Sequence, residues 1–250
     1  MAGLLGIGGG ALIVPVLEIV FEGQKVNPDV IMQAALGTSL ATIVFTAMSS
    51  TLAHHRRGAV DWTIFKRIAP GIVVGTLAGA ALADHLTTRT LKIMFVIFMF
   101  AVAAQFARGT MATRAHARLP GAAGTGFAGT VIGVASALFG IGGGSLSVPF
   151  MTWCSVPVKR AIGTSAAIGL PIAVSGAVGY IVAGWNEPSL PPWSFGYVVL
   201  PAFAGIVVAS TAAAPLGARL AHRLSETVLR RIFALFVALL GLRMLWGLLR

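Results

Sequence analysis

Long apolar runs without charged side chains follow one another along almost the whole chain. A helix that crosses a bilayer needs about 20 predominantly apolar residues, and fewer when flanking Lys or Arg side chains reach the interface. The pattern therefore predicts an all-α, polytopic membrane protein with no room for a separate soluble domain. The uncharged runs are Val30–Ala53, Ile68–Ala83, Ile93–Ala107, Leu119–Val158, Ala161–Asn186 and Pro188–Ala218, followed by Ile232–Leu242, which continues past Arg243 to Leu249.

Composition supports this class. Of the 250 residues, 57% are hydrophobic and only 10% are charged, whereas a soluble domain carries about 25% charged residues. Lys and Arg number 18 against 7 Asp and Glu, a net charge of +11, which in a membrane protein indicates basic cytoplasmic loops rather than nucleic-acid binding. Met1–Leu4 has no basic region typical of a signal peptide. Cys154 is the single cysteine, so no internal disulfide can form and a packing role is expected.

The sequence also contains an internal duplication. Leu5–Pro15 reappears as Phe139–Pro149 at an offset of 134 residues, and Ala35–Ser39 reappears as Ala161–Ser165 at an offset of 126. A weaker third match, in the same order, relates the five residues from 82 to those from 220. Such ordered matches indicate two copies of one structural unit.

This duplication divides the chain into three parts. Residues 1–107 form the first transmembrane repeat, residues 108–118 a basic cytoplasmic linker, and residues 119–250 the second repeat. Each repeat is expected to hold one Gly-broken segment, re-entrant or hairpin, and three spanning helices. Met1 aligns with Ala135, so the first repeat is expected to be shortened at its N-terminus.

The distribution of Lys and Arg predicts how the repeats are oriented. If every element crossed once, both faces would carry equal numbers of basic residues. If each Gly-broken segment enters and leaves on the same side, thirteen fall on one face and five on the other, as the positive-inside rule favours. Each repeat then crosses an odd number of times, so the two repeats are inverted, an arrangement of many secondary transporters. Leu119–Val158 would extend about 60 Å as one helix, so it is expected to fold back at Gly140–Gly144.

The two glycine runs are the strongest candidates for a binding site. Glycine lets the backbone approach a ligand closely, and a helix that begins after such a run presents unpaired amides and a partial positive charge to an anion. Two breaks that face each other would form an anion site near the middle of the bilayer. Close helix packing is the alternative, and a dinucleotide site is excluded because no strand precedes either run. The predicted site glycines are Gly8, Gly9, Gly10, Gly142, Gly143 and Gly144.

Hydroxyl groups follow these runs in both repeats. Thr38 and Ser39 in the first repeat, and Thr164 and Ser165 in the second, lie within apolar spans directly after a glycine. Their hydroxyls could donate hydrogen bonds to an oxyanion, and we include them in the predicted substrate site. The alternatives are bonds to carbonyls of their own helix or contacts between helices. The small-residue stripes that start at Gly71 and Gly205 predict close helix packing alone.

A few ionisable residues in or beside the spans are candidates for coupling or anion entry. Glu18 could carry a coupling proton, with an interfacial position near a polar loop as the commoner alternative. His54 and Arg57 end the Thr-Ser span and could attract anions to a cytoplasmic mouth, or simply set topology. His54 and His55 are adjacent, so they point apart on a helix and are weak metal ligands.

No acid–base pair or metal set lies within a span, so neither enzymatic activity nor a cofactor is expected. Three other functions remain as alternatives to a carrier. They are a passive anion channel, a divalent-metal permease that uses Glu18, His54 and His55, and a structural membrane protein without a substrate.

Paired Gly-x-Gly-Gly-Gly-x-Leu-x-Val-Pro segments, each followed by Gly-Thr-Ser, resemble the TauE/SafE sulfite exporter family over essentially the whole chain. The resemblance implies a permease of the prokaryotic plasma membrane, driven by protons or another gradient, for sulfite, sulfoacetate or related sulfur-containing anions. It places the substrate beside Gly8–Gly10 and Gly142–Gly144, with the two Thr-Ser pairs as neighbours. We therefore expect an alternating-access transporter, export being the expected direction, with a small oxyanion and the lipid bilayer as partners and no nucleic acid. The coupling ion and a homodimeric state stay open.

Overall fold

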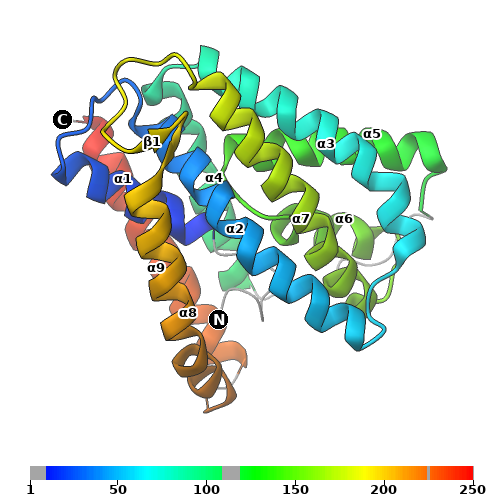
Figure 1. The fold of residues 1–250 in the computed structure, drawn as a ribbon. Coiled ribbons are helices and arrows are strands. Elements are labelled where there is room, and N and C mark those ends of the chain that lie inside the picture. Colours follow the sequence, from blue (N-terminus) through cyan, green and yellow to red (C-terminus); the bar gives the residue numbers. More distant parts are fainter. Residues whose placement is uncertain (1–9, 109–118, 224–225, 250) are drawn as a thin grey trace.

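The computed structural model describes residues 10–108, 119–223 and 226–249, and these residues form a helical bundle with one small hairpin of strands (Figure 1). The basic linker predicted at 108–118 lies almost wholly outside them, as do Gly8 and Gly9. The elements are α1 (Gly10–Gly23), α2 (Ile31–Arg56), α3 (Trp62–His85), α4 (Thr88–Arg108), α5 (Ala122–Leu138), α6 (Gly144–Trp153), α7 (Val158–Ala183), β1 (Ser194–Phe195), β2 (Val198–Val199), α8 (Leu200–Arg223) and α9 (Glu226–Leu249).

The predicted all-α, polytopic fold is confirmed. Each uncharged run of the sequence forms one long helix, apart from Leu119–Val158, which forms two helices. Within the described ranges, five helices are long and apolar enough to cross a membrane: α2, α3, α4, α7 and α9. The run from Pro188 departs from the prediction, because α8 begins only at Leu200. Pro188, Pro191 and Pro192 cannot donate helical hydrogen bonds, and the chain instead turns through Gly196, at φ +55°, between β1 and β2.

Helices α2 and α7 form the centre of the bundle and run antiparallel. Gly37 of α2 lies against Tyr180 of α7, and Thr51 donates a hydrogen bond to the carbonyl of Ala166 at 3.0 Å. Residues 31–43 of α2 are all buried. The buried core of the molecule therefore surrounds the N-terminal half of α2.

Helices α5 and α6 fold back on each other, as the length of Leu119–Val158 predicts. α5 runs parallel to α3, since Gly71 lies against Gly126 and Gly79 lies against Val134. The start of α5 is therefore beside the start of α3. The start of α7, which follows α6, is there too, because Arg160 pairs with Asp61 at 3.6 Å. The segment α5–α6 thus enters and leaves at the same end of the bundle.

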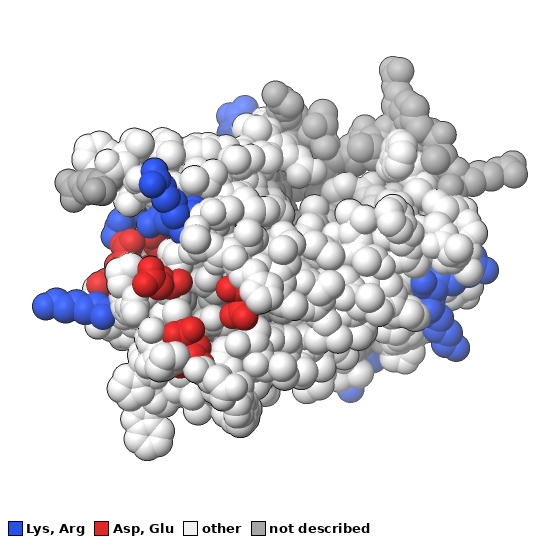
Figure 2. Space-filling model, turned by 90° about the horizontal axis from the view of Figure 1, so that it is seen from above, with Lys and Arg blue, Asp and Glu red and all other residues white. Residues whose placement is uncertain are grey.

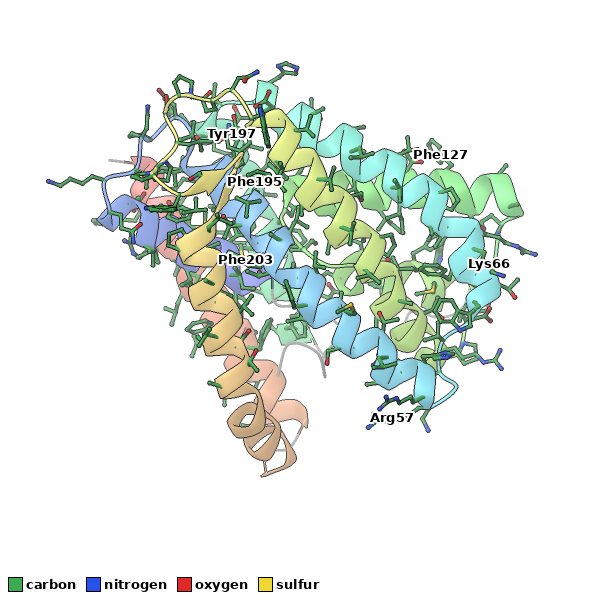
Figure 3. The ribbon with its side chains drawn as sticks, viewed as in Figure 1. Arg57, Lys66, Phe127, Phe195, Tyr197 and Phe203 are labelled. Carbon is green, nitrogen blue, oxygen red and sulfur yellow. The ribbon has the colours of Figure 1, made fainter. Side chains whose placement is uncertain are left out.

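Most charged residues of the described chain gather at two ends of the molecule (Figure 2). One end carries Arg56, Arg57, Asp61, Lys66, Arg67, Lys159 and Arg160. The other end carries Glu18, Glu22, Lys25, Asp29, Asp84, Arg89, Lys92, Glu187 and Arg243. Figure 3 shows the same separation, with Arg57 and Lys66 far from Tyr197, which hydrogen-bonds Asp84 at 2.7 Å. Below, these are called the basic end and the acidic end.

The first of the two small-residue stripes packs as predicted. A Cβ atom added at Gly71 or Gly75 would overlap the carbonyl oxygens of Gly126 and Thr130, so the backbones of α3 and α5 are in direct contact. The second stripe differs, because Gly205 of α8 has no heavy atom of the described chain within 4 Å of its Cβ position. The expected close packing at the second stripe is therefore not found at Gly205.

This difference predicts opposite effects of the same substitution. Gly75→Ala adds a methyl group where backbone atoms already touch, so we expect a loss of about 1–3 kcal/mol, as in other overpacked cores. Gly205→Ala adds the same methyl in open space and gains helix propensity, so it should leave stability unchanged or slightly raised. Thermal unfolding of both purified variants in detergent measures the difference. Equal midpoints would contradict the tight α3–α5 contact.

The fold-back of α5–α6 predicts which residues share one side of the membrane. In a Cys154→Ala background, Lys66→Cys and Lys159→Cys should react with an impermeant thiol reagent from the same side. Lys25→Cys and Asn186→Cys, at the acidic end, should react from the other side. All four positions are exposed. Labelling of Lys66→Cys and Lys159→Cys from opposite sides would show that the segment crosses the membrane.

Candidate functional site

A turn between α5 and α6 brings glycine backbone from both repeats together. Residues 139–143 form this turn, and Gly140 adopts φ +55°, a conformation that favours glycine. Gly10, the first residue of α1, lies directly against the turn: a Cβ atom there would overlap the Gly140 carbonyl and lie 2.8 Å from Ile141 Cα. The start of α1 therefore touches the turn that precedes α6, as two facing glycine runs predict.

The start of α6 presents buried amides at this turn. Its N-cap is Gly143, which has no side chain to cap the helix, and the Ser147 amide donates to the Gly143 carbonyl at 2.9 Å. The backbone amides of Gly142, Gly143 and Gly144 find no acceptor in the described part of the chain. Gly142 and Gly143 are buried. Unpaired amides at a helix N-terminus attract an anion.

α1 and α6 begin at the same place and end at opposite ends of the molecule. The last turn of α1 carries Glu22, which pairs with Lys92 and Arg243 at the acidic end. α6 ends at Trp153, a few residues before α7 begins at the basic end. The two helices therefore present their N-termini to a shared central region.

Two of the predicted hydroxyl residues lie beside the turn. Ser39 of α2 donates to the Gly140 carbonyl at 2.8 Å. Ser165 of α7 donates to the carbonyl of Ile162 in its own helix at 2.9 Å, and its carbonyl lies 3.0 Å from the Cβ position of Gly143. The structure therefore brings Ser39, Ser165, Gly10 and Gly143 together. Both serine hydroxyls donate their hydrogen bonds to backbone carbonyls.

The two predicted threonines lie elsewhere and hold the two halves of the chain together. Thr38 accepts a hydrogen bond from the Val199 amide at 3.0 Å, directly before α8. Thr164 accepts one from the Asp61 amide at 2.9 Å, directly before α3. The glycine that precedes each threonine packs against the same segment, which lets the backbones approach. These contacts correspond to the interhelical role that the sequence left as an alternative.

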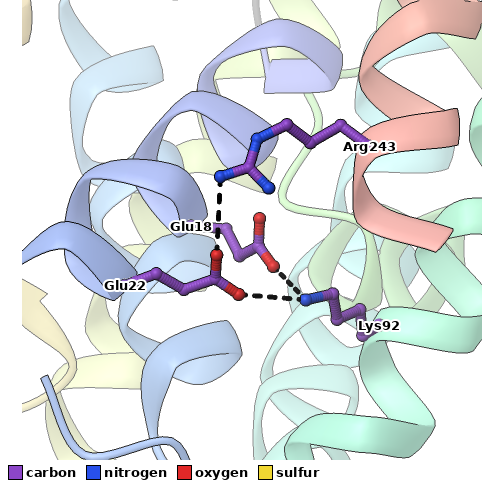
Figure 4. A network of polar contacts seen from close by, with 4 residues as sticks. All are labelled: Glu18, Glu22, Lys92 and Arg243. Carbon is purple, nitrogen blue, oxygen red and sulfur yellow. Dashed lines mark hydrogen bonds and ion pairs between the residues drawn. The ribbon is translucent and has the colours of Figure 1, made fainter. Parts of the chain in front are cut away.

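Glu18 belongs to a buried network of charges (Figure 4). Its side chain is 1% exposed and pairs with Lys92 of α4, itself 8% exposed. Lys92 also contacts Glu22 at 3.2 Å, and Glu22 pairs with Arg243 of α9 at 3.7 Å. Glu18 lies at the acidic end, near the polar loop that follows α1, and α1, α4 and α9 enclose its carboxylate, so it is buried within the protein. The sequence analysis did not identify Lys92 as the partner of Glu18. Glu18 and Glu22 lie one helical turn apart on the same face of α1, a pattern that indicates a shared cation.

His54 and Arg57 lie at the other end of the molecule from this network. Both are at the C-terminal end of α2, where Arg57 is exposed and His54 is half-buried. The neighbouring His55 accepts a hydrogen bond from the Trp62 indole at 3.3 Å. A metal site built from Glu18, His54 and His55 is thus excluded by the length of α2, and within the described ranges no three His, Cys, Asp or Glu residues are grouped for a metal.

The sequence missed two further polar residues at the turn. The hydroxyls of Ser136 in α5 and Ser147 in α6 are buried and have no hydrogen-bond partner within the part of the chain that the structure describes. One signal was present: Ser147 lies in the duplicated motif, at a position where the first copy has Ile13. A serine where the other copy has an apolar residue indicates a function that only the second repeat performs.

Taken with its helices and charge distribution, this architecture is that of a multi-pass membrane transporter, and the comparisons with known proteins define the family. The chain belongs to the sulfite exporter TauE/SafE family, whose model matches residues 1–244. The resemblance seen in the paired glycine motifs is thereby confirmed.

Curated relatives cover almost the whole chain. A "probable membrane transporter protein" of Haemophilus influenzae is 35% identical over 248 residues, which cover 98% of this chain and 92% of the relative. Similarly described proteins of Methanocaldococcus jannaschii and Bacillus subtilis are each 27% identical and also cover 98% of this chain, with 90% and 94% of their own lengths matched. No solved structure gives a significant match.

Proposed function

We propose that this protein is a secondary transporter that exports a small sulfur-containing oxyanion, sulfite or an organosulfonate, by alternating access. One observation carries the proposal: the amides of Gly142–Gly144 at the start of α6, which have no acceptor among the described residues and face the start of α1 at Gly10. The family and the relatives described as transporters support the general class. The choice of a sulfur oxyanion rests on the family description together with these amides.

Amide dipoles suit a substrate that must be released again. A helix N-terminus carries roughly half a positive charge, so it attracts an anion without the long residence that a buried Lys or Arg pair would cause. Most charged side chains of the described residues lie at the two ends of the bundle, away from the turn (Figure 2). The anion would therefore be held by backbone and hydroxyl donors.

Alternating access follows if the two repeats are inverted copies that rock against each other. Matching contacts support this arrangement. Thr38 binds the amide that precedes α8, and Thr164 binds the amide that precedes α3, so each repeat holds the entry to a helix of the other. The antiparallel pair α2–α7 would be the axis, with the site at the turn beside it. The positive-inside rule assigns the basic end, with His54 and Arg57, to the cytoplasmic side.

Glu18 is our candidate for the proton-coupling group. If Glu18 takes up a proton, Lys92 keeps Glu22 as its partner at 3.2 Å, so no lysine charge is left buried and unpaired. Glu22 in turn keeps Arg243. The charged groups from the other elements packed around Glu18, α4 and α9, thus stay compensated in both protonation states.

Transport in liposomes tests the function. The purified protein should accumulate ³⁵S-sulfite against its concentration gradient when a pH gradient is imposed. Gly143→Val should abolish this flux, because its side chain would meet the Ser165 carbonyl and Gly169 amide, already within 3.1 Å of the Cβ position. Gly121→Val is the matched control, since nothing lies within 4 Å of that position. Its flux should equal that of the wild type.

The same assay separates the alternatives. Flux that is only downhill, whatever gradient is imposed, would indicate a passive anion channel. Normal uphill flux in Gly143→Val would remove the turn from the transport path. Failure of the wild type to move sulfite, sulfoacetate or a simple alkanesulfonate would overturn the proposed substrate class.

The coupling role of Glu18 predicts a split between two modes of transport. Glu18→Gln should lose accumulation driven by a pH gradient but keep exchange of labelled for unlabelled substrate, which needs no net proton movement. Asp29→Asn removes an exposed carboxylate at the same end that belongs to none of these ion pairs, so it should keep both modes. Retained uphill accumulation in Glu18→Gln would show that the coupling group lies elsewhere, and retained exchange shows that the variant is folded.

A further inference from the structure

We propose that the hydroxyls of Ser147 and Ser136 bind the transported oxyanion directly, with Ser147 as the main contact; this inference rests on the proposed function. Both side chains are 0% exposed, and neither hydroxyl has a hydrogen-bond partner among the described residues. A buried polar group without a partner costs free energy, so such groups in a native protein indicate a bound water or ligand, or a functional role.

Other helix hydroxyls in the same molecule show that an easy alternative is available. A helical Ser or Thr can donate to a carbonyl three or four residues earlier in its own helix. Thr42, Thr76 and Ser175 do so, with hydrogen bonds of 2.7, 2.7 and 2.5 Å. Ser136 and Ser147 have the same opportunity and do not take it. Their hydroxyls are therefore available to a ligand.

Both serines are attached to the glycine turn through their backbones. The carbonyl of Ser136 accepts from the Ile141 amide at 3.1 Å, and the amide of Ser147 donates to the Gly143 carbonyl at 2.9 Å. Side chains on a helix lean toward its N-terminus. Ser147 therefore leans toward the first turn of α6, where the amides of Gly142–Gly144 lack acceptors.

The combination suits an anion with several oxygens. Amides at the helix start and a hydroxyl one turn later donate from different directions, and a sulfite or sulfonate group offers separate oxygens to each. The contribution is made by one repeat alone, because the first copy of the motif has Ile13 in place of Ser147. The site would thus be asymmetric even though two repeats form it.

The experiment compares Ser147→Ala and Ser136→Ala with Ser175→Ala, whose hydroxyl already bonds the carbonyl of Pro171 in its own helix. Sulfite transport in liposomes gives KM, and thermal unfolding in detergent is measured with and without sulfite, with chloride as the control anion. A hydrogen bond to a charged group predicts a KM raised about tenfold or more in Ser147→Ala. Stabilisation by sulfite should fall in parallel, while the unfolding midpoint without sulfite stays unchanged or rises. Ser136→Ala should change in the same direction.

Each other outcome has a defined meaning. If the wild type transports sulfite and the two alanine variants match it in KM, the hydroxyls hold water or nothing, and the inference is overturned while the proposed function stands. If the variants unfold at lower temperature than Ser175→Ala with KM unchanged, their role is structural, which also overturns it. If the wild type neither transports nor is stabilised by sulfite or a sulfonate, the proposed function and this inference fail together.

Discussion

The structure depends on how the backbone at the break between α5 and α6 satisfies its polar groups. Inside a bilayer a backbone amide or carbonyl has no water to bond, so irregular chain is stable only when protein or a bound ligand supplies partners. The preceding helix supplies some of these partners, because the amides of Phe139, Gly140 and Ile141 donate hydrogen bonds to carbonyls of α5. Ser39 supplies a hydroxyl to the Gly140 carbonyl. The amides of Gly142–Gly144 have no acceptor among the described residues, and the proposed anion site rests on them.

The packing around the turn follows from the same constraint. Helix association in lipid depends on close contact and interhelical hydrogen bonds rather than on the hydrophobic effect. α3 and α5 meet through glycines, and α2 and α7 anchor the segments before α8 and α3 through Thr38 and Thr164. These contacts fix the central helices around the turn. Most charged residues, which cannot lie in the apolar layer at low cost, occupy the two ends.

Elements that are encoded locally could be predicted from the sequence. Charge-free runs located the long helices, and the length of Leu119–Val158 together with its glycines located the fold-back. The duplication correctly placed Gly10 against the second glycine run. The β1–β2 hairpin was missed because its residues are as apolar as a span, so that only its prolines and Gly196 distinguish it. Thr38 and Thr164 were assigned to the site because spacing along the chain does not show which neighbour a hydroxyl meets.

The features that could not be predicted depend on contacts between distant residues. In the sequence, Lys92 is a charged residue near the start of a span, and only the packing of α1, α4 and α9 places it beside Glu18.

The packing of α1 links Glu18 to the glycine turn. Gly10 begins α1 and Glu18 follows two turns later in the same helix, a rise of about 12 Å. A change of charge at Glu18 alters what holds α1 against α4 and α9, and α1 connects this contact directly to Gly10 at the turn. The counterpart of Glu18 in α6 is Thr152, whose hydroxyl bonds carbonyls of its own helix. Of the two helices that meet at the glycine turn, only α1 therefore carries a buried carboxylate, and coupling to charge would act through that helix alone.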